Sequence, residues 1–283
     1  MANTQQSQAP GGFLPPTPQS PAASTTSSIS GLPHPRGHPL RPGSVKEDKV
    51  RNYVEERILY ISRRFVKKFG IQEASDEVIG YKSMAELCKD LEELINILWL
   101  SGTRMFYSLS GGNCPHSNIR LASLQVPYLL NIANEFNSWL SSFAPSPNAT
   151  FGVLRKLDHC FTSLLAGRDM ETKEHLPGFE NGLRGGMSKT DMVRCKSLVG
   201  QTRIIIVDVM SKERDLDDDD EETEVTETED DTEMDMPRHA GGWDEDDERL
   251  HMDVARVYEN TLVALGEILG AAGEVAPVQI SDD

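Results

Sequence analysis

The sequence of 283 residues has few cysteines, few aromatic residues and no long apolar run. Its four cysteines, Cys88, Cys114, Cys160 and Cys195, lack the close spacing of a disulfide framework, which favours reduced thiols in the nucleus or cytoplasm. The most apolar window, Leu94 to Leu100, is far shorter than the ~20 residues that span a bilayer. No basic region followed by an apolar run opens the sequence. We therefore expect a protein of the nucleus or cytoplasm that is not secreted and does not contact a membrane.

Sequence motifs that carry chemistry are also missing. No GxxxxGK[ST] phosphate-binding sequence is present, and the nearest stretch, Gly185 to Thr190, has serine where the second glycine is needed. The spacings H-E-x-x-H and C-x-x-C are absent. His159 and Cys160 are neighbours on a predicted helix, so they point in different directions and do not suit a nucleophile and its base. We predict no catalytic residues, no metal and no cofactor, which favours a non-enzymatic protein without settling the question.

Negative charge is abundant but confined to one block. The net charge of the chain is −17, while the stretch from Glu213 to Glu248 holds 20 acidic residues against Arg214 and Arg238, a net of −18. The remainder therefore sums to +1, and the overall charge describes this block rather than the rest of the chain.

We predict that residues 213–246 form a disordered acidic insert. One interpretation is that it binds protein partners, including basic proteins or histones, by mimicking nucleic-acid phosphate. The other interpretation is a solvated linker that self-repulsion keeps extended. The candidate partner-binding stretch is its densest run of charge, Asp217, Asp218, Asp219, Asp220, Glu221 and Glu222.

Residues 1–43 are predicted to be a disordered tail, because nine of the 16 prolines lie there among Ser, Thr, Gly and Gln. Thr17 and Ser20 each precede a proline. They are candidate phosphosites in a docking peptide, or they follow from a low-complexity composition alone.

Apolar residues recur at helical spacing through most of the remaining chain. Ser44 with Glu47, Ser83 with Glu86, and Ser188 with Asp191 have the spacing of a capping box that starts a helix. The clearest pattern lies in residues 188–212, where one face has steps of three and four. That face consists of Met192, Cys195, Val199, Thr202, Ile206 and Val209.

This pattern predicts an all-α fold, an irregular or up-and-down bundle of five to seven helices. We expect the bundle at residues 44–212, a final helix packing on it at 247–270, and a tail at 271–283. The apolar stripe of the final helix matches that of 188–212, so the two should pair antiparallel with the acidic insert at their tip. The expected helices cover residues 44–69, 83–99, 117–143 with a kink or a fresh start at Pro127, 150–165, 188–212 and 247–269.

Two features leave alternatives open. The first predicted helix ends in four basic residues, which form a nucleic-acid or localisation patch, complement the helix dipole, or receive the acidic insert of the same chain. We do not expect direct nucleic-acid binding. The polar loop 168–186 is either disordered or a binding surface. The four residues of the basic patch are Arg63, Arg64, Lys67 and Lys68.

Residues 12–70 and 190–212 resemble uncharacterised helical proteins of filamentous fungi that often carry a meiotic-recombination label. The resemblance rests on Phe13-Leu-Pro-Pro-Thr-Pro, Gly31-Leu-Pro-His-Pro-Arg-Gly-His38 and Tyr53-Val-Glu-Glu-Arg57, and it covers less than a third of the chain. The label implies strand exchange by a RecA-like recombinase, but the phosphate-binding signatures and the strand–helix alternation of that fold are absent. The resemblance therefore implies an accessory protein, and it assigns no functional residues.

The sequence favours a non-enzymatic helical adaptor or regulatory subunit of an intracellular complex, which contacts protein partners through its tail and acidic insert. One alternative is a chromatin-associated acidic chaperone or a meiotic recombination accessory factor. Another is an enzyme or small-molecule binder with a pocket inside the bundle. The oligomeric state stays open.

Overall fold

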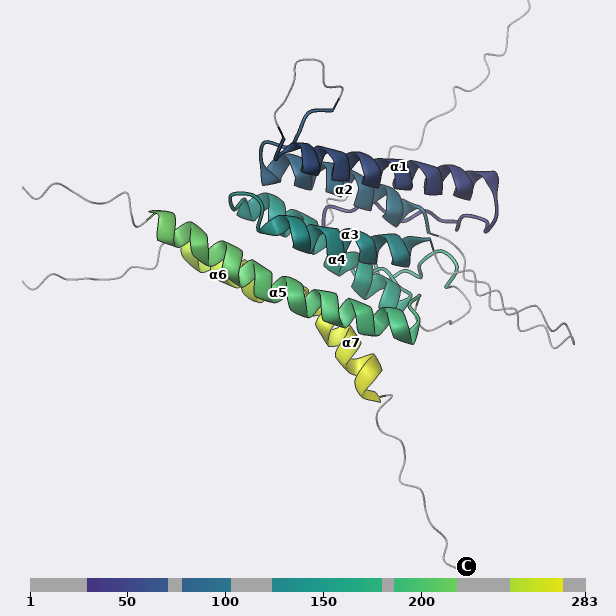
Figure 1. Cartoon of the computed structure of the whole chain (residues 1–283). Coiled ribbons are helices and arrows are strands. Elements are labelled where there is room, and N and C mark those ends of the chain that lie inside the picture. The colour runs from purple at the N-terminus through teal and green to yellow at the C-terminus, as the bar shows by residue number, and fades with distance from the viewer. Residues whose placement is uncertain (1–29, 71–77, 103–123, 180–185, 218–244, 272–283) are drawn as a thin grey trace, which may run out of the picture.

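The structure is a computed structural model that describes residues 30–70, 78–102, 124–179, 186–217 and 245–271. Within these ranges the chain forms seven α-helices and no strand beyond an isolated bridge between Arg168 and His175, which confirms the predicted all-α fold (Figure 1). The helices are α1 (Val45–Lys67), α2 (Met84–Leu100), α3 (Gln125–Leu140), α4 (Pro147–Ala166), α5 (Lys189–Asp217), α6 (Glu245–Ala255) and α7 (Glu259–Ala271).

The helix α2 packs on α4 at the centre of the bundle, with α1 against α2, α5 along α3 and α7 on α4 (Figure 1). The second half of α2 is apolar on almost all sides, and Leu94, Ile95, Leu98 and Trp99 are all buried. Burying a leucine or isoleucine side chain stabilises a fold by about 2 kcal/mol. This stretch therefore explains why α2 lies inside the bundle. None of the described helices is both long enough and apolar enough to cross a membrane.

All three predicted capping boxes start helices, and at α2 Ser83 Oγ accepts a hydrogen bond from the Glu86 backbone N at 3.4 Å. At α1, Ser44 Oγ accepts a hydrogen bond from the Glu47 backbone N at 3.3 Å, while the Glu47 carboxylate accepts one from the Gly43 N at 2.6 Å. At α5, Ser188 Oγ accepts from the Asp191 N at 3.1 Å, and Asp191 Oδ2 accepts from the Ser188 N at 3.3 Å. The start of each helix is therefore encoded within four or five neighbouring residues.

Two helices begin with a proline in their first turn. Pro127 lies in the first turn of α3, so the predicted interruption is a fresh start rather than a kink. Pro147 is the first residue of α4, which begins three residues before the expected Thr150. The predicted stop at Gly167 is confirmed, since this residue caps α4 in the left-handed conformation with a φ of 69°.

A charged cluster fastens α1 to α2. One guanidinium nitrogen of Arg57 and one of Arg64 each donate to the Asp90 carboxylate at 2.9 Å. The Tyr81 hydroxyl donates to the same carboxylate at 2.6 Å. Burial, together with this hydrogen bond, raises the pKa of Tyr81, so the hydroxyl stays protonated and keeps donating. Asp90 therefore joins two arginines and a tyrosine in one contact.

Replacing Asp90 by alanine is expected to lower the free energy of unfolding by about 2 kcal/mol, because two half-buried guanidiniums lose their carboxylate. Urea denaturation followed by circular dichroism measures the loss. The control is Glu93→Ala, because Glu93 is more than half exposed and meets Arg57 only at 3.5 Å. Equal losses in the two variants would contradict the role given to Asp90.

The final helix is not continuous, so the prediction of one helix over 247–269 is wrong. It breaks at Arg256–Tyr258 into α6 and α7, and Tyr258 has a left-handed backbone with a φ of 55°. Arg203 of α5 donates to the Val257 carbonyl at this break, at 3.0 Å. The helix α6 lies on α5, whereas α7 packs mainly on α4 and also contacts α5. The predicted pairing with α5 is therefore shared by α6 and α7.

Three cysteines, Cys88, Cys160 and Cys195, are free thiols that are fully buried. Burial raises the pKa of Cys88 and of Cys195 to about 12, and it raises that of Cys160 as well. The fourth, Cys114, lies outside the described residues. The three described thiols are therefore core groups that stay protonated near neutral pH.

In a Cys114→Ser variant, the other three thiols are expected to resist alkylation by iodoacetamide at pH 8 until denaturant is added. Mass spectrometry counts the labelled cysteines. Rapid labelling of the native protein would contradict the burial.

The raised pKa values of the thiols also make the stability of the fold depend on pH. The folded state favours protonated thiols, so stability is fully present below the ordinary thiol pKa of 9.0 and declines as pH rises toward about 12.

Candidate functional site

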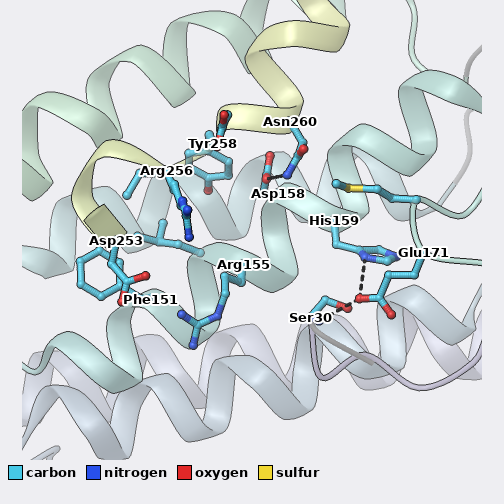
Figure 2. Close-up of a pocket in the computed structure, with 14 residues that line it drawn as sticks. Ser30, Phe151, Arg155, Asp158, His159, Glu171, Asp253, Arg256, Tyr258 and Asn260 are labelled. Atoms are coloured by element: carbon cyan, nitrogen blue, oxygen red, sulfur yellow. Dashed lines mark hydrogen bonds and ion pairs between the residues drawn. The ribbon is translucent and has the colours of Figure 1, made fainter. Parts of the chain in front are cut away.

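A pocket of about 420 Å³ lies where α4 meets the break between α6 and α7 (Figure 2). We call it the junction pocket. Apolar side chains of α4 and of the break line part of it, namely Phe151, Leu154 and Val257. Charged and polar groups from α4, from α6 and α7, from the turn after α4 and from the segment before α1 complete the lining. The pocket thus joins parts of the chain that are far apart in sequence.

Asp158 of α4 lies at one end of the junction pocket and holds the start of α7 (Figure 2). Its buried carboxylate accepts hydrogen bonds from the Thr261 backbone N at 2.8 Å, the Thr261 hydroxyl at 2.6 Å and the Asn260 side-chain nitrogen at 2.9 Å. The first N–H groups of a helix have no partner within it and attract negative charge. Tyr258, which precedes α7, has no side-chain acceptor in reach of them. Asp158 therefore caps α7 from another helix.

His159, Glu171 and Ser30 lie together at another end of the junction pocket (Figure 2). The His159 ring is buried edge-on to Trp99, with Nε2 3.5 Å from Asp169 Oδ2 and Nδ1 3.7 Å from Glu171 Oε1. Glu171 Oε1 also accepts from the Ser30 backbone N at 2.9 Å. Asp169 in turn accepts from two backbone N–H groups of its own turn. This cluster fastens the turn after α4 and the segment before α1 to the bundle.

Two arginines, Arg155 of α4 and Arg256 at the helix break, also line the junction pocket and are exposed. Among the residues that the structure describes, neither guanidinium has a hydrogen bond or an ion pair. Asp253 and Glu259 contribute negative charge to the same lining. An apolar floor with charges of both signs at the rim suits a side chain or peptide segment of a partner.

In the described part of the pocket His159 makes no hydrogen bond to a nucleophile: the Ser30 hydroxyl lies at the same end of the pocket but is buried without a hydrogen-bond partner. Cys160 is the neighbour of His159 in sequence, but that thiol is fully buried and its pKa is raised by burial. The polar groups that converge on the pocket contact helix ends and turns instead. The arrangement therefore orders the chain, and it leaves the arginines available to a partner.

The predicted basic patch lies at the end of α1, where Arg64 and Lys68 make internal contacts. Arg64 pairs with Asp90, and the Lys68 ammonium lies 4.2 Å from the centroid of the Phe143 ring. Arg63 is exposed. A role for this patch in binding stays a prediction. Its four residues are Arg63, Arg64, Lys67 and Lys68.

Other predicted site residues fall outside the described part of the chain. They include Thr17, Ser20 and the acidic residues 218–222, while Asp217 is the last residue of α5. The loop 168–186 is described as far as residue 179, and it contributes Met170 and Glu171 to the junction pocket. The sequence did not single out Asp158, Arg155 or Arg256, because none belongs to a local motif.

Fold and pocket together define an all-α chain whose buried polar groups join helices. The family described as subunit 11 of the general transcription factor TFIIH, TFB6, matches residues 80–266, which is more than half of the chain. The chain therefore belongs to the TFB6 family. The match covers α2 to α6 and most of α7, and every described residue of the junction pocket except Ser30 lies within it.

The chain is similar to two curated yeast proteins, one of which bears the family's name. The chain is 26% identical over 213 residues to the general transcription and DNA repair factor IIH subunit TFB6 of Saccharomyces cerevisiae, covering 65% of this chain and 60% of that one. It is 24% identical over 167 residues to an uncharacterised protein of Schizosaccharomyces pombe, covering 58% of this chain and 80% of that protein. This chain thus spans about 60% of the length of the S. cerevisiae relative. No solved structure matches the chain.

The expected link to proteins labelled as meiotic recombination proteins is wrong. The family is described as a subunit of the general transcription factor TFIIH, and the S. cerevisiae relative is named as a subunit of the transcription and DNA repair factor IIH. The resemblance rested mainly on residues 12–70, which lie outside the stretch that the family matches.

Proposed function

We propose that this chain is a non-enzymatic, nuclear subunit or regulator of a TFIIH-type transcription and DNA repair complex. The observation that carries the proposal is the match of residues 80–266 to the TFIIH subunit family. The S. cerevisiae relative bears the name of a subunit of the general transcription and DNA repair factor IIH. The coarser expectation of a helical adaptor or regulatory subunit agrees with this family.

The geometry of the junction pocket supports a binding role over a chemical one. Asp158 directs its hydrogen bonds to the first turn of α7, and Glu171 accepts from the segment before α1. The exposed guanidiniums of Arg155 and Arg256 stand at the rim, where a partner would meet them. Paired arginines bind carboxylates well because their planar donors match the two oxygens.

The test is capture of TFIIH from a nuclear extract of the organism of origin, using the tagged full-length chain. Core TFIIH subunits are expected in the captured fraction at physiological salt, as identified by mass spectrometry. An unrelated tagged protein of similar net charge is the control for simple ion exchange. Absence of TFIIH subunits from the captured fraction, with the chain folded by circular dichroism, would overturn the proposal.

The acidic insert is proposed to strengthen this capture electrostatically. Deleting residues 218–244 is expected to weaken the affinity for TFIIH about tenfold and to flatten its dependence on salt, since steering by exposed charge is screened. Biolayer interferometry at low and high salt measures both effects. Unchanged affinity and salt dependence after the deletion would mark the insert as a linker, and the capture itself would still test the subunit role.

A further inference from the structure

A second hollow, of about 180 Å³, lies between α5 and α6 at the root of the acidic insert. We call it the arm groove. Figure 1 shows α5 and α6 running side by side, past the ends of α3 and α4. The groove is therefore set apart from the centre of the bundle. Its lining residues are Val207, Met210 and Ser211 of α5 with Leu250, His251 and Val254 of α6.

The α5 side of the arm groove continues onto an exposed apolar strip. Val207 is 53% exposed and Ile204, one turn earlier on the same side, is 73% exposed. On the opposite face of α5, Ile206 and Val209 are already buried against the bundle. A helix that is apolar on its solvent side as well as on its buried side marks a surface for a further helix.

The charge around the groove restricts which kind of helix can bind there. The lining of the groove reaches Ser211 on α5 and begins again at Leu250 on α6, so in sequence it lies on either side of the stretch Glu213 to Glu248. The two helices that form its walls therefore carry the two ends of that stretch. That stretch has a net charge of −18. A second copy of this chain would bring an equal block of negative charge to the same place, and the two would repel. A basic partner would be attracted.

We propose that the arm groove docks an amphipathic helix of a TFIIH-type partner, with an apolar face in the groove and lysine or arginine on its flanks. This inference deepens the proposed function and depends on it for the identity of the partner. Apolar residues spaced by three or four along the partner helix would cover Val207 and fill the space between the two helices.

The first test compares Val207→Lys with Val263→Lys in the full-length chain. Val263 is an exposed valine on α7, 58% exposed, and lies outside the groove lining, so it is a matched control. Val207→Lys is expected to weaken binding to purified TFIIH about tenfold or more, because it places a charge in an apolar contact. Val263→Lys is expected to bind like the unmodified chain. Thermal denaturation confirms that both variants fold.

The outcomes separate the two proposals. If the unmodified chain binds TFIIH and Val207→Lys binds equally well, the groove proposal is overturned while the subunit proposal stands. If the unmodified chain does not bind TFIIH, the subunit proposal fails, and the groove is then judged by a model peptide alone.

That peptide is a helix of about 18 residues with leucine on one face and lysine elsewhere. Binding that Val207→Lys weakens about tenfold, with no binding of the same peptide carrying glutamate for lysine, supports the groove. Equal peptide binding by Val207→Lys overturns it. So does a dimer of the unmodified chain that Val207→Lys dissociates in sedimentation, because the occupant would then be a second copy.

Discussion

Replacing Ile206 by aspartate is expected to abolish the cooperative unfolding transition of the helical bundle. Ile206 is 0% exposed on the face of α5 that packs against the bundle. An unpaired carboxylate at such a site loses its hydration without gaining a partner, which costs several kcal/mol. Whole domains are stable by only about 5–15 kcal/mol. Circular dichroism during heating, or during urea titration, measures the effect.

The matched control for this substitution lies two residues away. Ile204→Asp makes the same chemical change at a side chain that is 73% exposed, so its effect on stability is expected to stay within about 0.5 kcal/mol. Retention of a cooperative transition near the original temperature by Ile206→Asp would refute the burial of this face. A large loss in Ile204→Asp would show that the outer side of α5 is covered as well.

Replacing Asp158 by alanine is expected to lower the free energy of unfolding by about 3 kcal/mol and to free the start of α7. The Thr261 backbone N, the Thr261 hydroxyl and the Asn260 side chain all donate to this carboxylate, and two of these contacts are buried. Hydrogen exchange should accelerate in α7 much more than in α2. Urea denaturation gives the change in free energy.

Two further variants sharpen the role of Asp158. Asp158→Asn keeps one acceptor oxygen and is expected to fall between the alanine variant and the unmodified chain. Asp253→Ala removes a carboxylate from the same pocket without breaking any hydrogen bond in the described part of the chain, so stability should hardly change. If Asp253→Ala proves as destabilising as Asp158→Ala, the cap is not what holds α7.

The features that sequence predicted well are local ones. The starts of α1 and α5 follow from a serine and a carboxylate three residues later, and the structure shows both contacts. The buried face of α5 follows from the spacing of Cys195, Val199 and Ile206, all of which are buried. In each case the information lies within a few turns of helix.

The features that sequence did not predict depend on residues far apart. The break before α7 needs Asp158, which is 103 residues away from its partner Thr261. Periodicity alone favoured a continuous helix there, because Leu250, Val254 and Val257 keep their spacing across the break. Likewise, the run Ile204 to Val207 is apolar on every side, so the pattern does not tell which of its residues faces solvent.

Because the chain bends at Tyr258, the direction of α6 depends on a single carboxylate, that of Asp158. A left-handed tyrosine is less stable than a helical one by about 1–2 kcal/mol, and a straight helix would satisfy the first N–H groups of α7 internally. The hydrogen bonds to Asp158 offset both the unfavourable backbone of Tyr258 and the N–H groups left without a partner at the start of α7, and so favour the bent arrangement. Only three residues separate α6 from α7, so the backbone conformation of this short link determines the angle between the two helices. The Asp158 cap therefore sets the direction of one wall of the arm groove as well as the start of α7.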